Sequence, residues 1–87
     1  MNDSQDLQHA FEQARQASTE LTERPDNATL LKLYALYKQG SQGDNDQPRP
    51  PFSEMVARAK WDAWTALKGL PREQAMRQYI DLIAGLE

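Results

Sequence analysis

Apolar side chains recur at helical spacing in four stretches of the sequence. Within each stretch they follow the i, i+3, i+4 and i+7 positions that form one face of an amphipathic helix. No stretch alternates between apolar and polar residues with the β-branched enrichment of a strand. The pattern therefore predicts an all-α fold with four helices. The predicted inward faces are Leu7, Ala10, Phe11, Ala14, Ala17 and Leu21; Leu30, Leu31, Tyr34 and Tyr37; Phe52, Met55, Val56, Ala59, Ala63, Trp64 and Leu67; and Ala75, Met76, Tyr79, Leu82, Ile83 and Leu86.

Glycine, proline and capping residues predict where these helices begin and end. Asp26 or Asn27 can cap the second helix, and Gly40 is expected to end it. Gly69 is expected to close the third helix and Pro71 to open the fourth, since glycine favours helix ends and proline favours helix starts. These residues leave one long connection, which begins at the end of the second helix.

The long connection is "GSQGDNDQPRPP", residues 40–51, with two glycines and three prolines. Loops of this length are uncommon in compact domains and are often functional. A structural crossover between two distant helices explains the length at least as well. Both interpretations remain open from the sequence.

Five polar or amphipathic side chains stand in the apolar faces. At about 100° per residue, Lys38 projects near Tyr34, and Lys60 is spaced four residues from an apolar neighbour on each side. Tyr37 and Tyr79 complete the set. Such lysines can extend their ammonium groups to water, and such tyrosines can be core residues whose hydroxyl groups reach solvent. Alternatively, these groups converge on a ligand with an aromatic base and a phosphate, because tyrosine offers a ring and a hydroxyl and lysine a point charge.

Composition narrows the possible functions. The 87 residues suffice for one domain, so residues 1–87 are expected to form a single unit. Ten Lys and Arg against thirteen Asp and Glu give a net charge of −3, and the basic residues are scattered, which disfavours nucleic-acid binding. A monomer is expected. Stable membrane insertion is not expected, because no stretch approaches the roughly 20 apolar residues of a membrane span. The polar N-terminus does not resemble a secretory signal, and cysteine is absent, so a cytoplasmic location is expected.

The inventory of reactive groups predicts that the protein is not an enzyme. His9 is the single histidine, and its position is polar. No pair of carboxyl groups is placed in an apolar pocket, where one could act as an acid and the other as a base. The segment "GSQGD" lacks the lysine and serine spacing of a phosphate-binding loop. We therefore expect no catalytic residue, metal or cofactor.

Four quoted segments together resemble the acyl-CoA-binding protein family. They are "LYALYKQ", "GD", "AKWDAWTALKG" and "EQAMRQYIDLI", in that order, and the resemblance runs from about Phe11 to Leu86. It implies a four-helix bundle in an up-down-down-up arrangement, with the long loop as the crossover between the second and third helices. It also implies non-covalent binding of long-chain fatty acyl-CoA by an intracellular carrier and pool buffer, without catalysis or a cofactor.

The resemblance also implies a set of ligand-binding residues. The tyrosines would embrace adenine and ribose, and Lys38 with Lys60 would neutralise the 3′-phosphate. Thr19 and Val56 stand where family members commonly carry further lysines. The implied site residues are Tyr34, Ala35, Leu36, Tyr37, Lys38, Lys60 and Tyr79.

The acyl tail needs small and apolar residues that face each other across helices. Our candidates for this groove are Ala14, Ala17, Leu30, Leu31 and Met55, and simple packing in the core remains the alternative for each of them. A second class of function remains open, namely a helical protein-interaction module that has lost ligand binding. The two convergent lysines favour the ligand, because a groove for a partner helix has no evident need for them.

Overall fold

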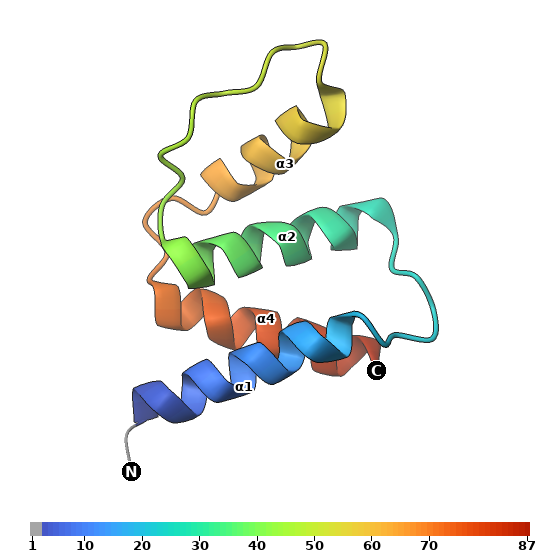
Figure 1. Cartoon of the computed structure of the whole chain (residues 1–87), viewed down its shortest axis with the longest axis vertical. Coiled ribbons are helices and arrows are strands. Elements are labelled where there is room, and N and C mark those ends of the chain that lie inside the picture. The colour runs from blue at the N-terminus through green and yellow to red at the C-terminus, as the bar shows by residue number, and fades with distance from the viewer. Residues whose placement is uncertain (1–2) are drawn as a thin grey trace.

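The computed structural model describes residues 3–87, and within this range it contains four helices and no strand. The helices are α1 (Asp3–Ser18), α2 (Asn27–Gln42), α3 (Met55–Thr65) and α4 (Arg72–Leu86). Figure 1 shows α1 and α4 running in one direction and α2 and α3 in the other. The predicted all-α fold and its up-down-down-up arrangement are confirmed.

The helix α2 lies in the middle of the arrangement. It packs against α4 on one side and α3 on the other, while α1 packs against α4. Figure 1 shows the resulting flat layer, whose Cα atoms span 46 × 30 × 14 Å. The helix α3 makes no comparable contact with α1 or α4. Because α2 has partners on two sides, its apolar residues are distributed around more than one face.

The core lies between α1, α2 and α4, and the face that α2 contributes differs from the predicted one. The most deeply buried residues of α2 are Leu36, Ala35 and Leu33, together with the polar Gln39 and with Gly40. The predicted face of Leu30, Leu31, Tyr34 and Tyr37 was wrong as a core face, since all four residues are half-buried. The remaining core residues are Phe11, Ala14, Ala75, Met76, Tyr79 and Ile83.

The predicted inward face of α3 was also largely wrong. Trp64 is the one fully buried residue of this helix. Phe52, Met55 and Val56 keep 79%, 75% and 70% of their surface exposed. The reason is geometric, because α3 rests on α2 along one side and the rest of its surface has no helical partner within residues 3–87.

Several predicted boundaries shift by two or three residues. The helix α1 ends at Ser18 and not at Leu21, and α3 spans Met55–Thr65, inside the predicted limits. Gly40 does not end α2. It lies within the helix, where an added Cβ would stand 3.0 Å from Phe11 Cζ, so its small size permits close packing. The glycine that ends the helix is Gly43, with φ +83°.

Two other predicted boundaries are confirmed. Asp26 caps α2, because its Oδ1 accepts a hydrogen bond from the Thr29 backbone N–H at 2.8 Å. The hydrogen bonds from Thr29 also hold the pKa of the Asp26 carboxyl below its ordinary value. Pro71 directly precedes α4, as expected. The expectation that Gly69 closes α3 was wrong, because α3 ends at Thr65 with Ala66 as its C-cap, and Gly69, with φ +90°, lies in the turn that follows.

A buried amide joins the end of α2 to the turn before α4. Gln39 is 1% exposed, and its Nε2 donates to Asp44 Oδ1 at 2.9 Å and to the Leu70 carbonyl at 2.8 Å. Asp44 Oδ1 also accepts from the Gly69 N–H at 2.9 Å. The Gly69 hydrogen bond, then that of Gln39, and then the charge of Lys68 hold the pKa of Asp44 below its ordinary value.

The loop between α2 and α3 runs back along α3 and is hydrogen-bonded to it. Trp61 Nε1 donates to the Gln47 carbonyl at 2.8 Å, and Trp64 Nε1 donates to the Gly43 carbonyl at 2.9 Å. Asn45 Nδ2 donates to Thr65 Oγ1 at 3.0 Å. The long connection is therefore a crossover between two parallel helices, which confirms the structural interpretation of its length.

Replacing Gly43 by alanine should destabilise the fold. Its φ of +83° and ψ of −152° lie in a region of backbone conformation that is essentially restricted to glycine. We therefore expect the free energy of unfolding to fall by about 1–3 kcal/mol. Gly85→Ala is the matched control, since no atom lies within 4 Å of an added Cβ and alanine favours a helix. Chemical denaturation of both variants measures the difference. Equal free energies of unfolding would contradict the backbone geometry at Gly43.

The carboxylate of Asp44 should stabilise the fold in a pH-dependent way. Its folded-state pKa lies below the ordinary 3.8, so the stabilisation is present above that value and is lost as the pH falls through the lowered pKa. Asp44→Asn should therefore lower the unfolding temperature at pH 7, and the gap to the unchanged protein should narrow below about pH 4. Thermal unfolding from pH 7 to pH 2 tests this, with the exposed Asp81→Asn as control. A gap that is constant over the whole range would contradict it.

Candidate functional site

Two lysines and two aromatic rings face each other across α2 and α3. Lys60 Nζ lies 5.4 Å from the centroid of the Tyr34 ring, and Lys38 Nζ lies 4.9 Å from the Trp64 ring. Tyr34 and Lys38 are four residues apart on α2, and Lys60 and Trp64 are four apart on α3. Because the two helices run in the same direction, the pairs align one turn apart. We call these four residues the lysine–aromatic ladder.

The two lysines of the ladder differ in exposure. Lys38 is half-buried over Trp64, which is 3% exposed, whereas Lys60 is exposed. Among the residues whose side chains are described, neither ammonium has a carboxylate within 4.0 Å; the one ion pair found there joins Arg49 to Asp62. At one helix interface the fold thus presents two positive charges that have no counterion among the described side chains, on a chain of net charge −3.

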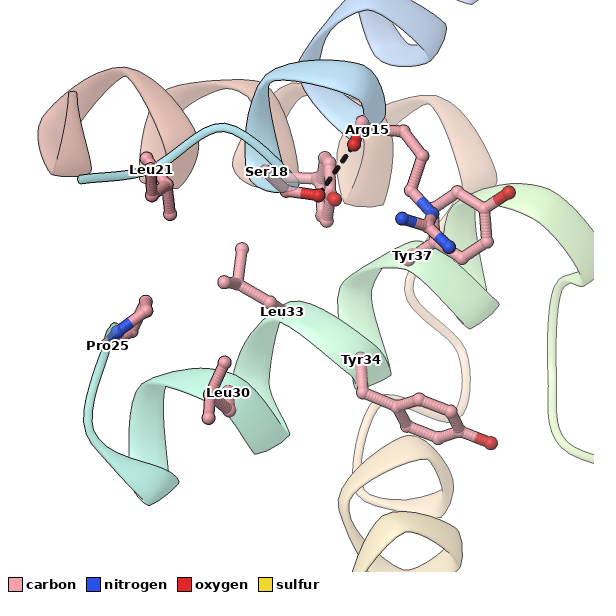
Figure 2. A pocket seen from close by; sticks show the side chains of 9 residues that line it. Arg15, Ser18, Leu21, Pro25, Leu30, Leu33, Tyr34 and Tyr37 are labelled. Carbon is pink, nitrogen blue, oxygen red and sulfur yellow. Dashed lines mark hydrogen bonds between the residues drawn. The ribbon is translucent and has the colours of Figure 1, made fainter. Parts of the chain in front are cut away.

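A pocket of about 200 Å³ between α1 and α2 brings the three predicted tyrosines together. Tyr37 stacks on Phe11 with ring centroids 5.3 Å apart, and Tyr79 meets the edge of Phe11 at 5.3 Å. We call this the tyrosine pocket (Figure 2). Its lining comprises Arg15, Ser18, Leu21, Pro25, Leu30, Leu33, Tyr34, Tyr37 and Tyr79.

Arg15 is a lining residue that sequence reasoning missed. Its guanidinium carbon lies 5.1 Å from the centroid of the Tyr37 ring, and Figure 2 shows its side chain extending from α1 to that ring. The spacing Phe11, Arg15, Ser18 follows i, i+4, i+7 and places all three on one face of α1. That spacing places Arg15 on the face of Phe11, but it does not show that Tyr37 of α2 lies beside this face.

Ala35 and Leu36 lie between the tyrosines in sequence and are buried, at 3% and 1% exposure. Leu36 belongs to the hydrophobic core. Neither side chain lines the tyrosine pocket or either of the two neighbouring hollows that are described below. They fix the helical turn that carries Tyr34 and Tyr37, and their contact with a ligand stays a prediction.

A second hollow, of about 470 Å³, lies between α2 and α3. This volume falls within the roughly 300–1,000 Å³ that is typical of small-molecule sites. We call it the α2–α3 groove. It is largely apolar, with Lys60 and Arg24 as its cationic residues. Its lining comprises Arg24, Asn27, Leu30, Leu31, Met55, Val56, Ala59 and Lys60.

The α2–α3 groove unites three of the five candidate tail residues, Leu30, Leu31 and Met55. Ala14 is instead buried in the core, and Ala17 packs against that core. Neither alanine lines the groove. The alanines of α1 and the leucines of α2 therefore do not line the same groove, because α1 packs on α4 and the groove opens towards α3. A contact between a tail and these residues stays a prediction.

The hollows form one continuous surface around Tyr34. Leu30 lines both the tyrosine pocket and the α2–α3 groove. A third hollow, beneath the prolines of the crossover loop, shares Tyr34 with the pocket and shares Lys60 and Val56 with the groove. Trp61 also lines this third hollow, which we call the loop hollow. Aromatic, cationic and apolar surfaces therefore adjoin one another in that region.

Other kinds of site find little support in the described part of the chain. Within residues 3–87 no group of three His, Asp or Glu side chains could hold a metal ion. His9 is exposed on α1. No helix in the same range combines the length and apolar character needed to span a bilayer.

Comparison with known proteins shows which families and proteins have a similar sequence. The family model described as "Acyl CoA binding protein" matches residues 8–83. The acyl-CoA-binding protein of Saccharomyces cerevisiae is 47% identical over 73 residues, which cover 84% of each chain. Enoyl-CoA delta isomerase 2 of Homo sapiens is 43% identical over 79 residues, or 91% of this chain. The chain spans only 20% of the length of that human protein.

Two solved structures share the fold. The crystal structure of Oryza sativa acyl-CoA-binding protein 2 superposes with a TM-score of 0.91 at 37% identity, covering 95% of this chain and 90% of that one. The solution structure of the yeast acyl coenzyme A binding protein gives a TM-score of 0.71 at 46% identity, covering 87% and 88%. The resemblance thus extends over nearly the whole molecule.

Proposed function

Because the chain belongs to the acyl-CoA-binding protein family, we propose that it binds long-chain fatty acyl-CoA thioesters non-covalently and acts as a carrier and buffer of their pool. The observation that carries this proposal is the continuity of the tyrosine pocket, the lysine–aromatic ladder and the α2–α3 groove. These surfaces offer an aromatic wall, two lysines and an apolar channel. A nucleotide thioester contains the complementary groups in one molecule.

The head group is assigned to the tyrosines and the ladder. Tyr34, Tyr37 and Tyr79 line the side that would face adenosine, and Lys38 with Lys60 would neutralise the 3′-phosphate. Lys60 is exposed over Tyr34, so a phosphate can approach its ammonium from solvent. Stacking on an aromatic ring contributes roughly 1–3 kcal/mol. Association itself costs about 4 kcal/mol or more, so the head group alone should bind modestly.

The acyl tail is assigned to the α2–α3 groove. Met55 and Val56 are 75% and 70% exposed at its edge, and an acyl chain lying in the groove would cover this apolar surface. Each buried CH₂ contributes about 0.8 kcal/mol, so a long tail outweighs the polar contacts together. Affinity then comes mainly from the tail, while the head group determines which class of thioester is accepted.

We further propose that the protein is a monomer, that it acts in the cytoplasm and that residues 1–87 form a single binding domain. It would require no cofactor, carry out no reaction on the thioester and have no role in nucleic-acid binding or membrane insertion. The cysteine-free composition is compatible with a reducing compartment. The acidic net charge and scattered basic residues favour a small anionic ligand held by local cations over a polyanion.

Calorimetric titration should show one-to-one binding of palmitoyl-CoA below its micelle concentration. Free CoA and palmitate should each bind far more weakly, because each lacks half of the contacts. In a series of shorter acyl chains the affinity should fall by roughly threefold to fourfold per CH₂ until the groove is no longer reached. Failure of palmitoyl-CoA to bind would overturn the proposed function and favour a helical protein-interaction module.

Lys38→Ala and Lys60→Ala should each weaken palmitoyl-CoA binding by at least about tenfold, the effect of losing one charge-assisted hydrogen bond. Lys32→Ala is the matched control, because Lys32 is an exposed lysine of α2 that does not belong to the lysine–aromatic ladder. Circular dichroism should show unchanged helicity in all three variants. Unchanged affinity in both Lys38→Ala and Lys60→Ala would remove the phosphate assignment.

A further inference from the structure

The tyrosine pocket has a cation of its own. Arg15 lines it, whereas Lys38 and Lys60 do not. In this chain the family resemblance implies Lys38 and Lys60 as phosphate ligands, since Thr19 and Val56 replace the further lysines of the family. Both lysines lie at the side of α2 where α3 packs. The side of the pocket formed by α1 therefore carries a positive charge that has no role in the binding site proposed above.

Arg15 is available to a ligand. It is exposed in the last turn of α1, and no hydrogen bond within residues 3–87 uses its guanidinium. No carboxylate oxygen among the described side chains lies within 4.0 Å of it. Its recorded side-chain partner is the ring of Tyr37, 5.1 Å from the guanidinium carbon. Its backbone carbonyl accepts a hydrogen bond from Ser18 Oγ at 2.6 Å (Figure 2), and this bond does not involve the guanidinium.

The contact with Tyr37 orients this cation. An arginine over an aromatic face is held by cation–π attraction while its N–H donors remain free at the edge of the guanidinium plane. Those donors form a fork that matches two oxygens of one phosphate group. Tyr37 is itself fixed by stacking on the buried Phe11. The guanidinium is therefore partly preorganised by a half-buried ring that packs against the core.

We propose that Arg15 is a phosphate-binding residue for the nucleotide head group, acting from α1 while Lys38 and Lys60 act from α2 and α3. This assignment rests on the proposed acyl-CoA function and adds a third cation to it. Tyr34 lines both the tyrosine pocket and the loop hollow that contains Lys60, so one nucleotide can extend from one to the other. Coenzyme A offers two sources of phosphate, the 3′-monophosphate and the pyrophosphate.

The test compares three variants by calorimetric titration with palmitoyl-CoA and with its 3′-dephospho analogue. Arg15→Met removes the charge and keeps a long apolar stem, whereas Arg15→Lys keeps the charge. Arg77→Met removes the same charge from an exposed site on α4 that lines none of the hollows. We expect Arg15→Met to weaken palmitoyl-CoA binding by about fivefold to tenfold, and its affinity to depend less steeply on salt. Arg15→Lys should lose less, and Arg77→Met should bind like the unchanged protein.

Each outcome decides one point. If the loss in Arg15→Met vanishes with the 3′-dephospho analogue, the contact is to the 3′-phosphate; if it persists, the contact is to the pyrophosphate. Equal affinity of Arg15→Met and the unchanged protein would overturn the assignment. A loss in Arg15→Met that stays the same at high salt would overturn it too, because packing on Tyr37 and not charge would then be responsible. If the unchanged protein does not bind palmitoyl-CoA, the proposed function itself fails, and the assignment fails with it.

Discussion

The parallel packing of α2 and α3 is the constraint on which the rest of this structure depends. Consecutive helices that run in the same direction need a connection that returns along the length of the second helix, and the crossover loop does so. Hydrogen bonds from Trp61 and Trp64 to loop carbonyls attach that loop to α3. The same parallel direction aligns Tyr34 with Lys60 and Lys38 with Trp64, so the local sequence spacing becomes a spatial match across the interface.

The sequence was sufficient to predict four helices, their order and the starts of α2 and α4, because helical periodicity and capping are local properties. It was not sufficient to predict which apolar face is buried. Leu33 and Leu36 enter the core while Leu30 and Leu31 line a groove, and nothing within α2 distinguishes these leucines. Likewise, the apolar residues at the start of α3 resemble core positions, but their exposure follows from the lack of a second helix beside them.

The candidate site shows the same division between local and tertiary information. The lysines and tyrosines could be selected because polar groups in an apolar stripe are conspicuous, and the family resemblance supplied their roles. Their division between two sides of α2 could not be predicted, because it depends on where α1 and α3 pack. Arg15 was missed for the same reason. A single arginine near the end of a helix is ordinary in sequence, and only the position of Tyr37 on another helix makes it a pocket residue.

The attachment of α3 through one side has a consequence for motion. Separating α3 from α2 would uncover Trp64 but leave the core of α1, α2 and α4 intact, so this opening should require less free energy than global unfolding. A molecule bound across both helices opposes that separation by mass action. Amide hydrogens of α3 should therefore exchange with solvent ahead of those in α4, and occupancy of the groove should slow them most. On the proposed assignment of this groove to an acyl tail, release of the tail would then be governed by how often α3 separates from α2.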